Sequence, residues 1–310
     1  MSSAAHDLTR TGAATDGAPR PVTEALLFPG QGVPTTAIVD ALRAHATDPL
    51  VARLHHQIGG GDWAGHDYTD PQVLQPALFV ASLARARHAD RGRALVVLGH
   101  SMGELAAMTY AGALFEEEAL EAVNRRAQMC TEENSRRPGS MVVLIGADAA
   151  RAEWLRRCSV ARTGGVLEIA AWNNARHVTL AGDPASIADV TVHADEQGLV
   201  VVPLPVAGAY HSPLMTGAAE RFAAYLEDLP FRPPEAEVIS TVLCRPVSSP
   251  ADLRAALVMG LVAPVRWAES LAAARGRGIT QAYDVGPGAI LAKLSRRHST
   301  TLVHPLEGAS

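Results

Sequence analysis

Short apolar runs that alternate with longer helical patterns constrain the fold of this chain more than any other feature. Residues 25–28, 94–98 and 282–285 have the length and composition of buried strands, and residues 76–88 and 104–112 have the pattern of helices. Strands and helices that alternate in this way build a parallel sheet with crossover helices. The sequence therefore predicts an α/β domain.

The pattern changes between about residues 138 and 208. Four strand patterns and two helix patterns follow one another there in the order β-α-β-β-α-β, which is typical of a small ferredoxin-like layer. The strands are expected at 141–146, 166–171, 177–181 and 199–206, and the helices at 150–158 and 184–197. We therefore expect an inserted α+β small domain at 138–208, flanked by a larger catalytic domain at 22–137 and 209–304. Residues 1–21 are small and polar, and we expect them to be a disordered lead.

Composition excludes several classes of function. A net charge of −5 without any basic run argues against nucleic-acid binding. Cys130, Cys158 and Cys244 lie far apart without metal-ligand spacing, so we expect no disulfide framework and no metal site, as fits a reducing cytoplasm. No apolar run reaches the roughly 18 residues of a membrane span. We expect a cytoplasmic protein that binds neither nucleic acid nor membrane.

A candidate nucleophile follows the strand pattern at 94–98. The run Gly-His-Ser-Met-Gly at 99–103 stands between that strand and a helix, which is the context that the GxSxG pattern requires. The glycines permit a tight turn that exposes Ser101 beside backbone N–H groups able to stabilise negative charge. A plain structural turn is the alternative, because chance matches to this pattern are common.

A serine hydroxyl needs a general base within hydrogen-bond reach. The chain holds twelve histidines, and His211 is the candidate because it follows the last strand pattern of the insert, at the edge where such sites form. His100 precedes Ser101 directly and is badly placed to turn back onto it. A structural role for His211 remains the alternative.

Several further motifs, taken in order, resemble the malonyl-CoA:acyl-carrier-protein transacylases and the related acyltransferases of polyketide synthases. The resemblance extends over nearly the whole chain and implies an α/β-hydrolase-like large domain. It is carried by the motifs FPGQG at 28–32, QPAL at 75–78, GHSMGE at 99–104, LAG at 180–182, LPV at 204–206, YHSPLM at 210–215, PVRW at 264–267 and DVGPG at 284–288.

The resemblance also implies roles for single residues. Ser101 would be acylated, and His211 would be its base, oriented by a main-chain carbonyl for which Gly260 is the candidate. The N–H of Met102 would be the main oxyanion donor, helped by the side-chain amide of Gln31.

Two further positions concern the acyl group. The resemblance places the arginine of carboxylate-accepting enzymes at Arg126, whose guanidinium would offer two parallel donors to a malonyl carboxylate. Arg125 stays open as the alternative, because Met129 lies four residues after Arg125 and three after Arg126. The Ala-Tyr-His run that includes Tyr210 is similar to the pattern that accompanies malonyl-type substrates.

The resemblance implies ping-pong transfer of a malonyl-type group from CoA, through Ser101, to the phosphopantetheine thiol of an acyl carrier protein in fatty acid or polyketide biosynthesis. It implies no cofactor and no metal, and we expect a monomer. The carrier is usually acidic, so we expect a local basic patch, from Arg296 with Arg297 or from Arg156 with Arg157. Alternatives are the transfer of a larger or uncharged acyl group between two carriers, trans-acting loading of a polyketide synthase, an editing hydrolase or α/β-type thioesterase, and a non-catalytic homologue that holds a carrier protein.

Overall fold

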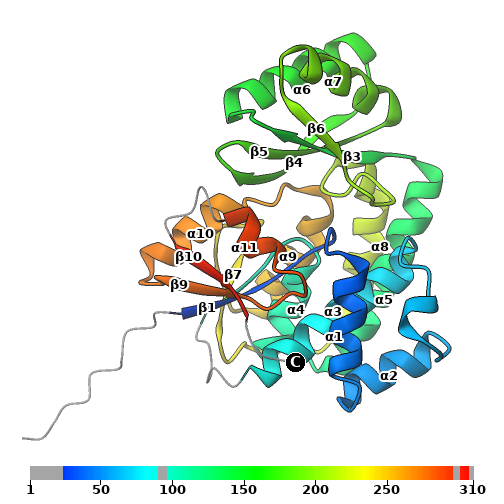
Figure 1. Ribbon diagram of the computed structural model, residues 1–310, viewed down its shortest axis with the longest axis vertical. Helices are drawn as coiled ribbons and strands as arrows, with labels where there is room; N and C mark the ends of the chain where they lie inside the picture. The colour runs from blue at the N-terminus through cyan, green and yellow to red at the C-terminus, as the bar shows by residue number, and fades with distance from the viewer. Residues whose placement is uncertain (1–23, 90–95, 296–300, 307–310) are drawn as a thin grey trace, which may run out of the picture.

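The computed structural model describes residues 24–89, 96–295 and 301–306. The predicted disordered lead and the pair Arg296 and Arg297 lie outside these residues. In the described part the chain forms a larger lower body and a small upper body, each with its own sheet (Figure 1).

A six-stranded sheet forms the centre of the larger body. Its strand order is β10-β9-β1-β2-β7-β8, and every neighbouring pair is parallel except β7 with β8. The strands are β1 (Glu24–Phe28), β2 (Val96–Gly99), β7 (Glu237–Ser240), β8 (Arg245–Val247), β9 (Gln281–Asp284) and β10 (Leu302–Pro305). The central strands are buried on both faces, as apolar runs without polar alternation predict.

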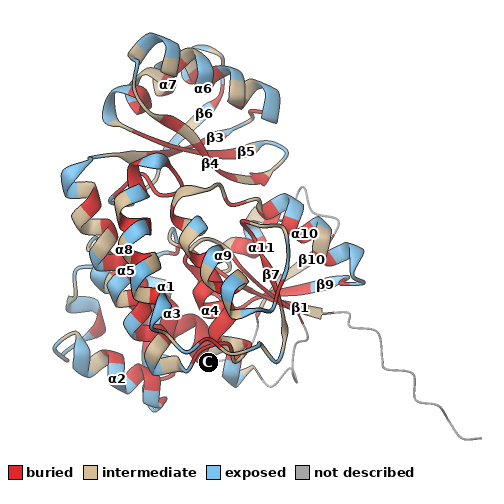
Figure 2. Cartoon of the chain, turned by 180° about the vertical axis from the view of Figure 1, so that it is seen from behind, coloured by how far each residue is buried: buried red, intermediate tan, exposed pale blue. Residues whose placement is uncertain are grey.

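Helices pack around this sheet. They are α1 (Thr35–Ala44), α2 (Pro49–Gln57), α3 (Pro71–His88), α4 (Gly103–Tyr110), α5 (Glu116–Arg136), α8 (Thr216–Glu227), α9 (Pro250–Val262), α10 (Trp267–Gly276) and α11 (Ile290–Ser295), with short 3₁₀ turns at Trp63–Gly65 and Pro213–Met215. Burial is greatest along the inner strands β9, β1, β2 and β7 and on α3 and α4 (Figure 2). These two helices are apolar on almost all sides because other elements cover them.

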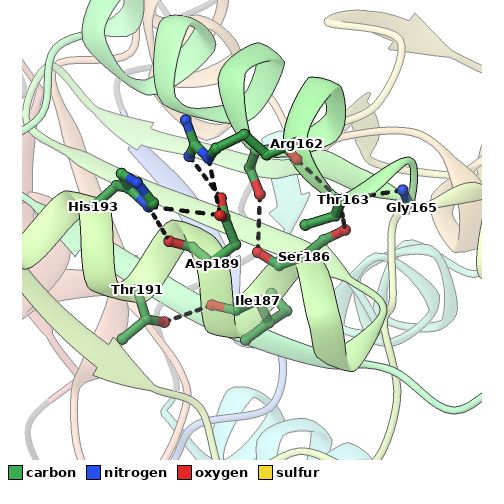
Figure 3. A network of polar contacts seen from close by, with 9 residues as sticks. Arg162, Thr163, Gly165, Ser186, Ile187, Asp189, Thr191 and His193 are labelled. Carbon is green, nitrogen blue, oxygen red and sulfur yellow. Dashed lines mark hydrogen bonds and ion pairs between the residues drawn. The ribbon is translucent and has the colours of Figure 1, made fainter.

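The small body is an antiparallel sheet of order β4-β5-β3-β6, covered on its outer face by two helices (Figure 1). Its elements are β3 (Ser140–Ile145), α6 (Ala149–Thr163), β4 (Leu167–Asn174), β5 (His177–Gly182), α7 (Pro184–Glu196) and β6 (Val200–Pro203). The helices are joined by polar contacts, among them a two-bond ion pair from Arg162 to Asp189 and a hydrogen bond between the Thr163 and Ser186 hydroxyls (Figure 3). The Ser159 hydroxyl also donates to the Ser186 carbonyl.

The predicted fold class, a parallel α/β sheet with an inserted ferredoxin-like layer, is confirmed. Individual elements differ from prediction. The helix expected at 76–88 begins five residues earlier, at Pro71, because the Asp70 side chain caps the N–H of Gln72.

The sheet brings distant loops together. β1 pairs with β2 on one side and β9 on the other, so Phe28 lies beside Gly99 and Leu27 beside Asp284. The loops that follow these three strands therefore leave the same carboxyl edge of the sheet, where ligands bind in open α/β folds. Gln31 and Ser101 stand in two of those loops.

Candidate active site

Ser101 occupies a strained turn between β2 and α4. Its φ is 55°, a left-handed conformation that is uncommon for residues other than glycine. A Cβ at Gly99 would lie 2.1 Å from the Glu104 nitrogen, and one at Gly103 would lie 2.2 Å from the Phe28 carbonyl oxygen. Both flanking glycines are thus required by close backbone approach, and the turn places the hydroxyl at the sheet edge.

The Ser101 hydroxyl is hydrogen-bonded to His211, with 2.8 Å between Oγ and Nε2. The other ring nitrogen, Nδ1, lies 3.1 Å from the carbonyl oxygen of Ala263. Since a carbonyl only accepts, Nδ1 carries the proton and Nε2 is free to accept the serine proton. The prediction that the Gly260 carbonyl orients His211 is wrong, because the Ala263 carbonyl, three residues later, contacts the imidazole. The nearby Leu261 carbonyl accepts a hydrogen bond from the backbone N–H of His211.

His211 is held neutral. Burial lowers the pKa of its imidazole to about 3, and the positive charge of Arg126 and the neighbouring His100 add to the decrease. A neutral imidazole is the form that accepts a proton, so the pair is ready for base catalysis at neutral pH.

Arg126 and Arg125 have opposite environments. Arg126 is buried, with 4% of its surface exposed. Arg125 lies on the outer face of α5, where its side chain is 49% exposed and pairs with Glu121. The structure therefore gives no support to Arg125 as the residue that faces a substrate.

The Arg126 side chain has neutral partners. Its Nη1 donates to Gln75 Oε1 at 2.6 Å, and the guanidinium lies 5.7 Å from the centre of the Tyr210 ring. The Gln75 Nε2 group in turn lies 3.3 Å from the Tyr210 hydroxyl. Within the part of the chain that the structure describes, no carboxylate forms a salt bridge with Arg126. The buried guanidinium can therefore form an ion pair with the carboxylate of a ligand.

The two predicted oxyanion donors stand in the loops that follow β1 and β2. Met102 is buried at the start of α4, where the first N–H groups of a helix have no intrahelical acceptor. Gln31 is half-buried and reaches the Tyr210 hydroxyl, and its buried Oε1 accepts no hydrogen bond from any described residue. Their role at an oxyanion remains a prediction.

A cavity of about 630 Å³ opens beside this group, between the two bodies. One wall comes from the inner face of the small sheet, and the opposite wall comes from α11 and the loop after β1. The lining is mainly apolar, and Arg176 and Lys293, both exposed, bring positive charge to it. The apolar lining residues are Val143, Ile145, Val202, Leu204, Ile290, Leu291 and Leu294.

His100 joins the nucleophile turn to the small sheet. Its Nε2 lies 2.9 Å from Asn173 Oδ1, and the Asn173 amide nitrogen lies 3.1 Å from both His177 Nδ1 and Thr179 Oγ1. All four residues line the cavity. The residue before Ser101 is thus fixed by the small body, and the sequence pattern did not single out Asn173.

The basic pair predicted at Arg156 and Arg157 provides no free patch. Both guanidinium groups bind Glu153, and Arg156 also contacts Glu168. Both arginines belong to α6, on the outer side of the small sheet (Figure 1).

The described residues contain no cluster of histidine, cysteine and carboxylate side chains suited to a metal ion. Among their helices, none has the length and apolar character needed to cross a membrane.

Comparisons with known proteins agree with this geometry. The family described as acyl transferase domain matches residues 35–302. The chain is 32% identical over 299 residues to the polyketide biosynthesis protein ThaF of Burkholderia thailandensis, covering 91% of this chain and 25% of that protein. It therefore spans about a quarter of that much longer relative.

Two solved structures are similar over almost their whole length. One is an acyl-carrier-protein S-malonyltransferase from Burkholderia pseudomallei 1710b, with a TM-score of 0.84 and 28% identity over 92% of this chain and 96% of that one. The other is a malonyl-transacylase in complex with its type II polyketide synthase acyl-carrier protein. Its TM-score is 0.81, with 27% identity over 91% of this chain and 94% of that one.

Proposed function

We propose, since the chain belongs to the acyl transferase domain family, that it transfers a malonyl-type acyl group from CoA to the phosphopantetheine thiol of an acyl carrier protein, through an ester on Ser101. The observation that supports the acyl class is the buried guanidinium of Arg126, which has only neutral partners among the described residues. The similar proteins do not distinguish a role in fatty acid biosynthesis from one in polyketide biosynthesis.

The chemistry follows from the Ser101–His211 pair. The Ser101 oxygen attacks the thioester carbonyl while its proton moves to His211 Nε2, and the carbonyl electrons form an oxyanion that the Met102 N–H and the Gln31 amide stabilise. The intermediate expels the CoA sulfur, which takes the proton from His211. The carrier thiol then gives its proton to His211 and attacks the ester carbonyl, and Ser101 leaves with that proton.

Arg126 selects the acyl group by charge. A carboxylate that enters a buried site loses its hydration, and this cost is offset only by a paired cation. The planar guanidinium can give two parallel hydrogen bonds to the carboxylate. An acetyl group gains nothing from this arrangement, so we expect malonyl to be preferred.

The cavity between the two bodies suits the pantetheine arm of both CoA and the carrier. Its apolar walls fit a long, thin and largely uncharged chain, and its His100 side lies next to Ser101. Arg176 and Lys293 would meet the phosphate at the outer end of that arm. Arg176 and Lys293 would thus supply the local positive charge that we expected from Arg156 and Arg157.

Loading measured by mass spectrometry tests this proposal. Arg126→Ala should reduce malonyl selectivity over acetyl by roughly 2 to 5 kcal/mol, the scale observed when one partner of a buried charge pair is lost. Arg125→Ala is the matched control and should leave the ratio unchanged, because Arg125 is exposed. Ser101→Ala should show no adduct. Equal malonyl-to-acetyl ratios in wild type and Arg126→Ala would contradict the acyl class and favour transfer of a larger uncharged acyl group.

A second measurement separates transfer from hydrolysis. With holo carrier protein present, the acyl group should pass from Ser101 to the carrier much faster than free acid appears. Free-acid release that is rapid and indifferent to added carrier would identify an editing hydrolase instead.

A further inference from the structure

The polar group around Arg126 contains a residue with no role in the transfer described above. Gln75 lies in α3, its side chain is fully buried, and α3 packs directly against α5, which carries Arg126. Its amide connects the guanidinium to the Tyr210 hydroxyl, with contacts of 2.6 Å and 3.3 Å. A fully buried amide with two specific partners is fixed in one orientation.

Hydrogen-bond chemistry determines that orientation. A guanidinium only donates, so the amide oxygen of Gln75 must face Arg126 and the amide NH₂ must face away. The Tyr210 hydroxyl oxygen accepts from that NH₂ group. Without the hydroxyl, the buried NH₂ group would lose an acceptor, and a flipped amide would set its donors against the donors of Arg126.

The contact also determines which side of the guanidinium remains available. Nη1 donates to Gln75, and the Tyr210 ring lies beside the cation. An arginine side chain has five N–H donors, so the donors of Nε and Nη2 remain for a ligand. A guanidinium anchored on one side presents the other side in one fixed direction.

We propose that Gln75 is a positioning residue that, itself oriented by the Tyr210 hydroxyl, presents the Arg126 guanidinium to the carboxylate of the acyl group. This inference rests on the proposed malonyl-type transfer and adds to it the residue pair that fixes substrate selectivity. Gln75 acts through Arg126 and does not touch the reacting atoms.

Two substitutions test the inference without changing the size of the side chains greatly. Gln75→Glu places a carboxylate against Arg126 and neutralises the cation before substrate arrives. Tyr210→Phe keeps the ring and removes the hydroxyl oxygen that accepts from the Gln75 amide, an oxygen that the Gln31 side chain also reaches. Gln72→Glu is the matched control, because Gln72 is exposed in the first turn of the same helix.

The measurement is the rate of Ser101 loading with malonyl-CoA and with acetyl-CoA, with KM and kcat determined separately. We expect Gln75→Glu to lower the malonyl-to-acetyl ratio at least about tenfold, mainly through a higher KM for malonyl-CoA. Tyr210→Phe should lower the ratio in the same direction by a smaller factor. Gln72→Glu should keep the wild-type ratio.

The possible outcomes are distinct. A ratio in Gln75→Glu that matches wild type overturns the positioning role, and so does a parallel loss of malonyl and acetyl loading in both variants, since that result indicates a structural role. If Gln75→Glu does not fold, the ratio in Tyr210→Phe decides. Failure of the proposed function appears elsewhere, as a wild-type protein that does not load malonyl on Ser101.

Discussion

The two residues of the proposed catalytic pair, Ser101 and His211, have strained backbone conformations. Both Ser101 and His211 have positive φ, at 55° and 63°. Such conformations cost of order 1 kcal/mol or more for a residue with a Cβ, and they persist only where the surrounding structure imposes them. The turn that exposes the serine hydroxyl therefore stores conformational energy.

This strain gives a prediction that separates stability from activity. Ser101→Gly should be more stable than Ser101→Ala by about 1 kcal/mol, because glycine adopts a left-handed φ without steric cost. Both variants should lack the acyl adduct. Urea denaturation compares the two free energies of unfolding. Equal stability would mean that the turn is relaxed in solution.

Glu104 is a buried acid that the transfer does not use. Burial raises the pKa of its carboxyl to about 7, against hydrogen bonds from Ser240 and Thr241 that favour the charged form. Its Oε1 has no hydrogen-bond partner among the described residues. The folded protein therefore favours the neutral carboxylic acid.

The direction of the resulting pH dependence follows from this raised pKa. Between pH 4.5 and about 7 the unfolded carboxyl is ionised while the folded one is neutral, so folding takes up a proton and stability falls as pH rises. Glu104→Gln removes the ionisation and should be more stable than wild type by up to about 3 kcal/mol at pH 8. The two proteins should converge below pH 4.5. Parallel stability curves over this range would refute a raised pKa.

Elements differ in how much of their position the sequence reveals. The strands of the small sheet were predictable because short apolar runs such as those of β3 and β5 are a local signal. β7 and β8 were missed, since each is short and forms a strand only by pairing with its neighbours. α5 was also missed because it is rich in glutamate, although its buried positions recur every three or four residues and include Arg126. That period would have separated Arg126 from Arg125.

Two contacts at the site could not be predicted from the sequence, one with a backbone carbonyl and one between distant side chains. The Ala263 carbonyl that orients His211 carries no side-chain signature, and its place depends on where α9 ends. Gln75 belonged to a recognised motif, yet its partner Arg126 lies 51 residues away. Such pairs are set by helix packing, which local patterns do not encode.

The caps of the two outer helices give a prediction at this scale. Asp183 caps α7 by accepting from the Ser186 backbone N–H, and it also accepts from the Val166 N–H, next to β4. Asp148 caps α6 through Arg151 alone. Asp148→Ala should cost about 1 kcal/mol, and Asp183→Ala should cost more, about 2 kcal/mol, because it also leaves the Val166 N–H without its acceptor. Denaturant titration of both variants gives the comparison, and equal costs would show that the second contact contributes nothing.

The whole molecule separates two tasks. The six-stranded sheet carries Ser101, and neighbouring segments of the same body supply His211 and Arg126. The small sheet closes one wall of the cavity and holds His100 through Asn173. The net charge of −5 would repel an acidic carrier, so productive docking depends on cations placed locally at the cavity. Among the residues that the structure describes, Arg176 and Lys293 are the arginine and lysine side chains that line it.

Removal of the Arg176 and Lys293 charges should weaken binding of the carrier protein more than it slows loading of Ser101. Arg176→Ala combined with Lys293→Ala should raise KM for holo carrier protein about tenfold, on the basis of roughly 0.7 kcal/mol for each exposed charge contact. The effect should shrink as salt rises, because exposed charges are screened. Transfer from malonyl-N-acetylcysteamine, a thioester without phosphate, should keep its wild-type rate of Ser101 loading. Arg157→Ala is the control, since Arg157 lies on the outer helix and binds Glu153. An equal loss with the phosphate-free thioester would mean that the two side chains shape the cavity and do not bind the phosphate.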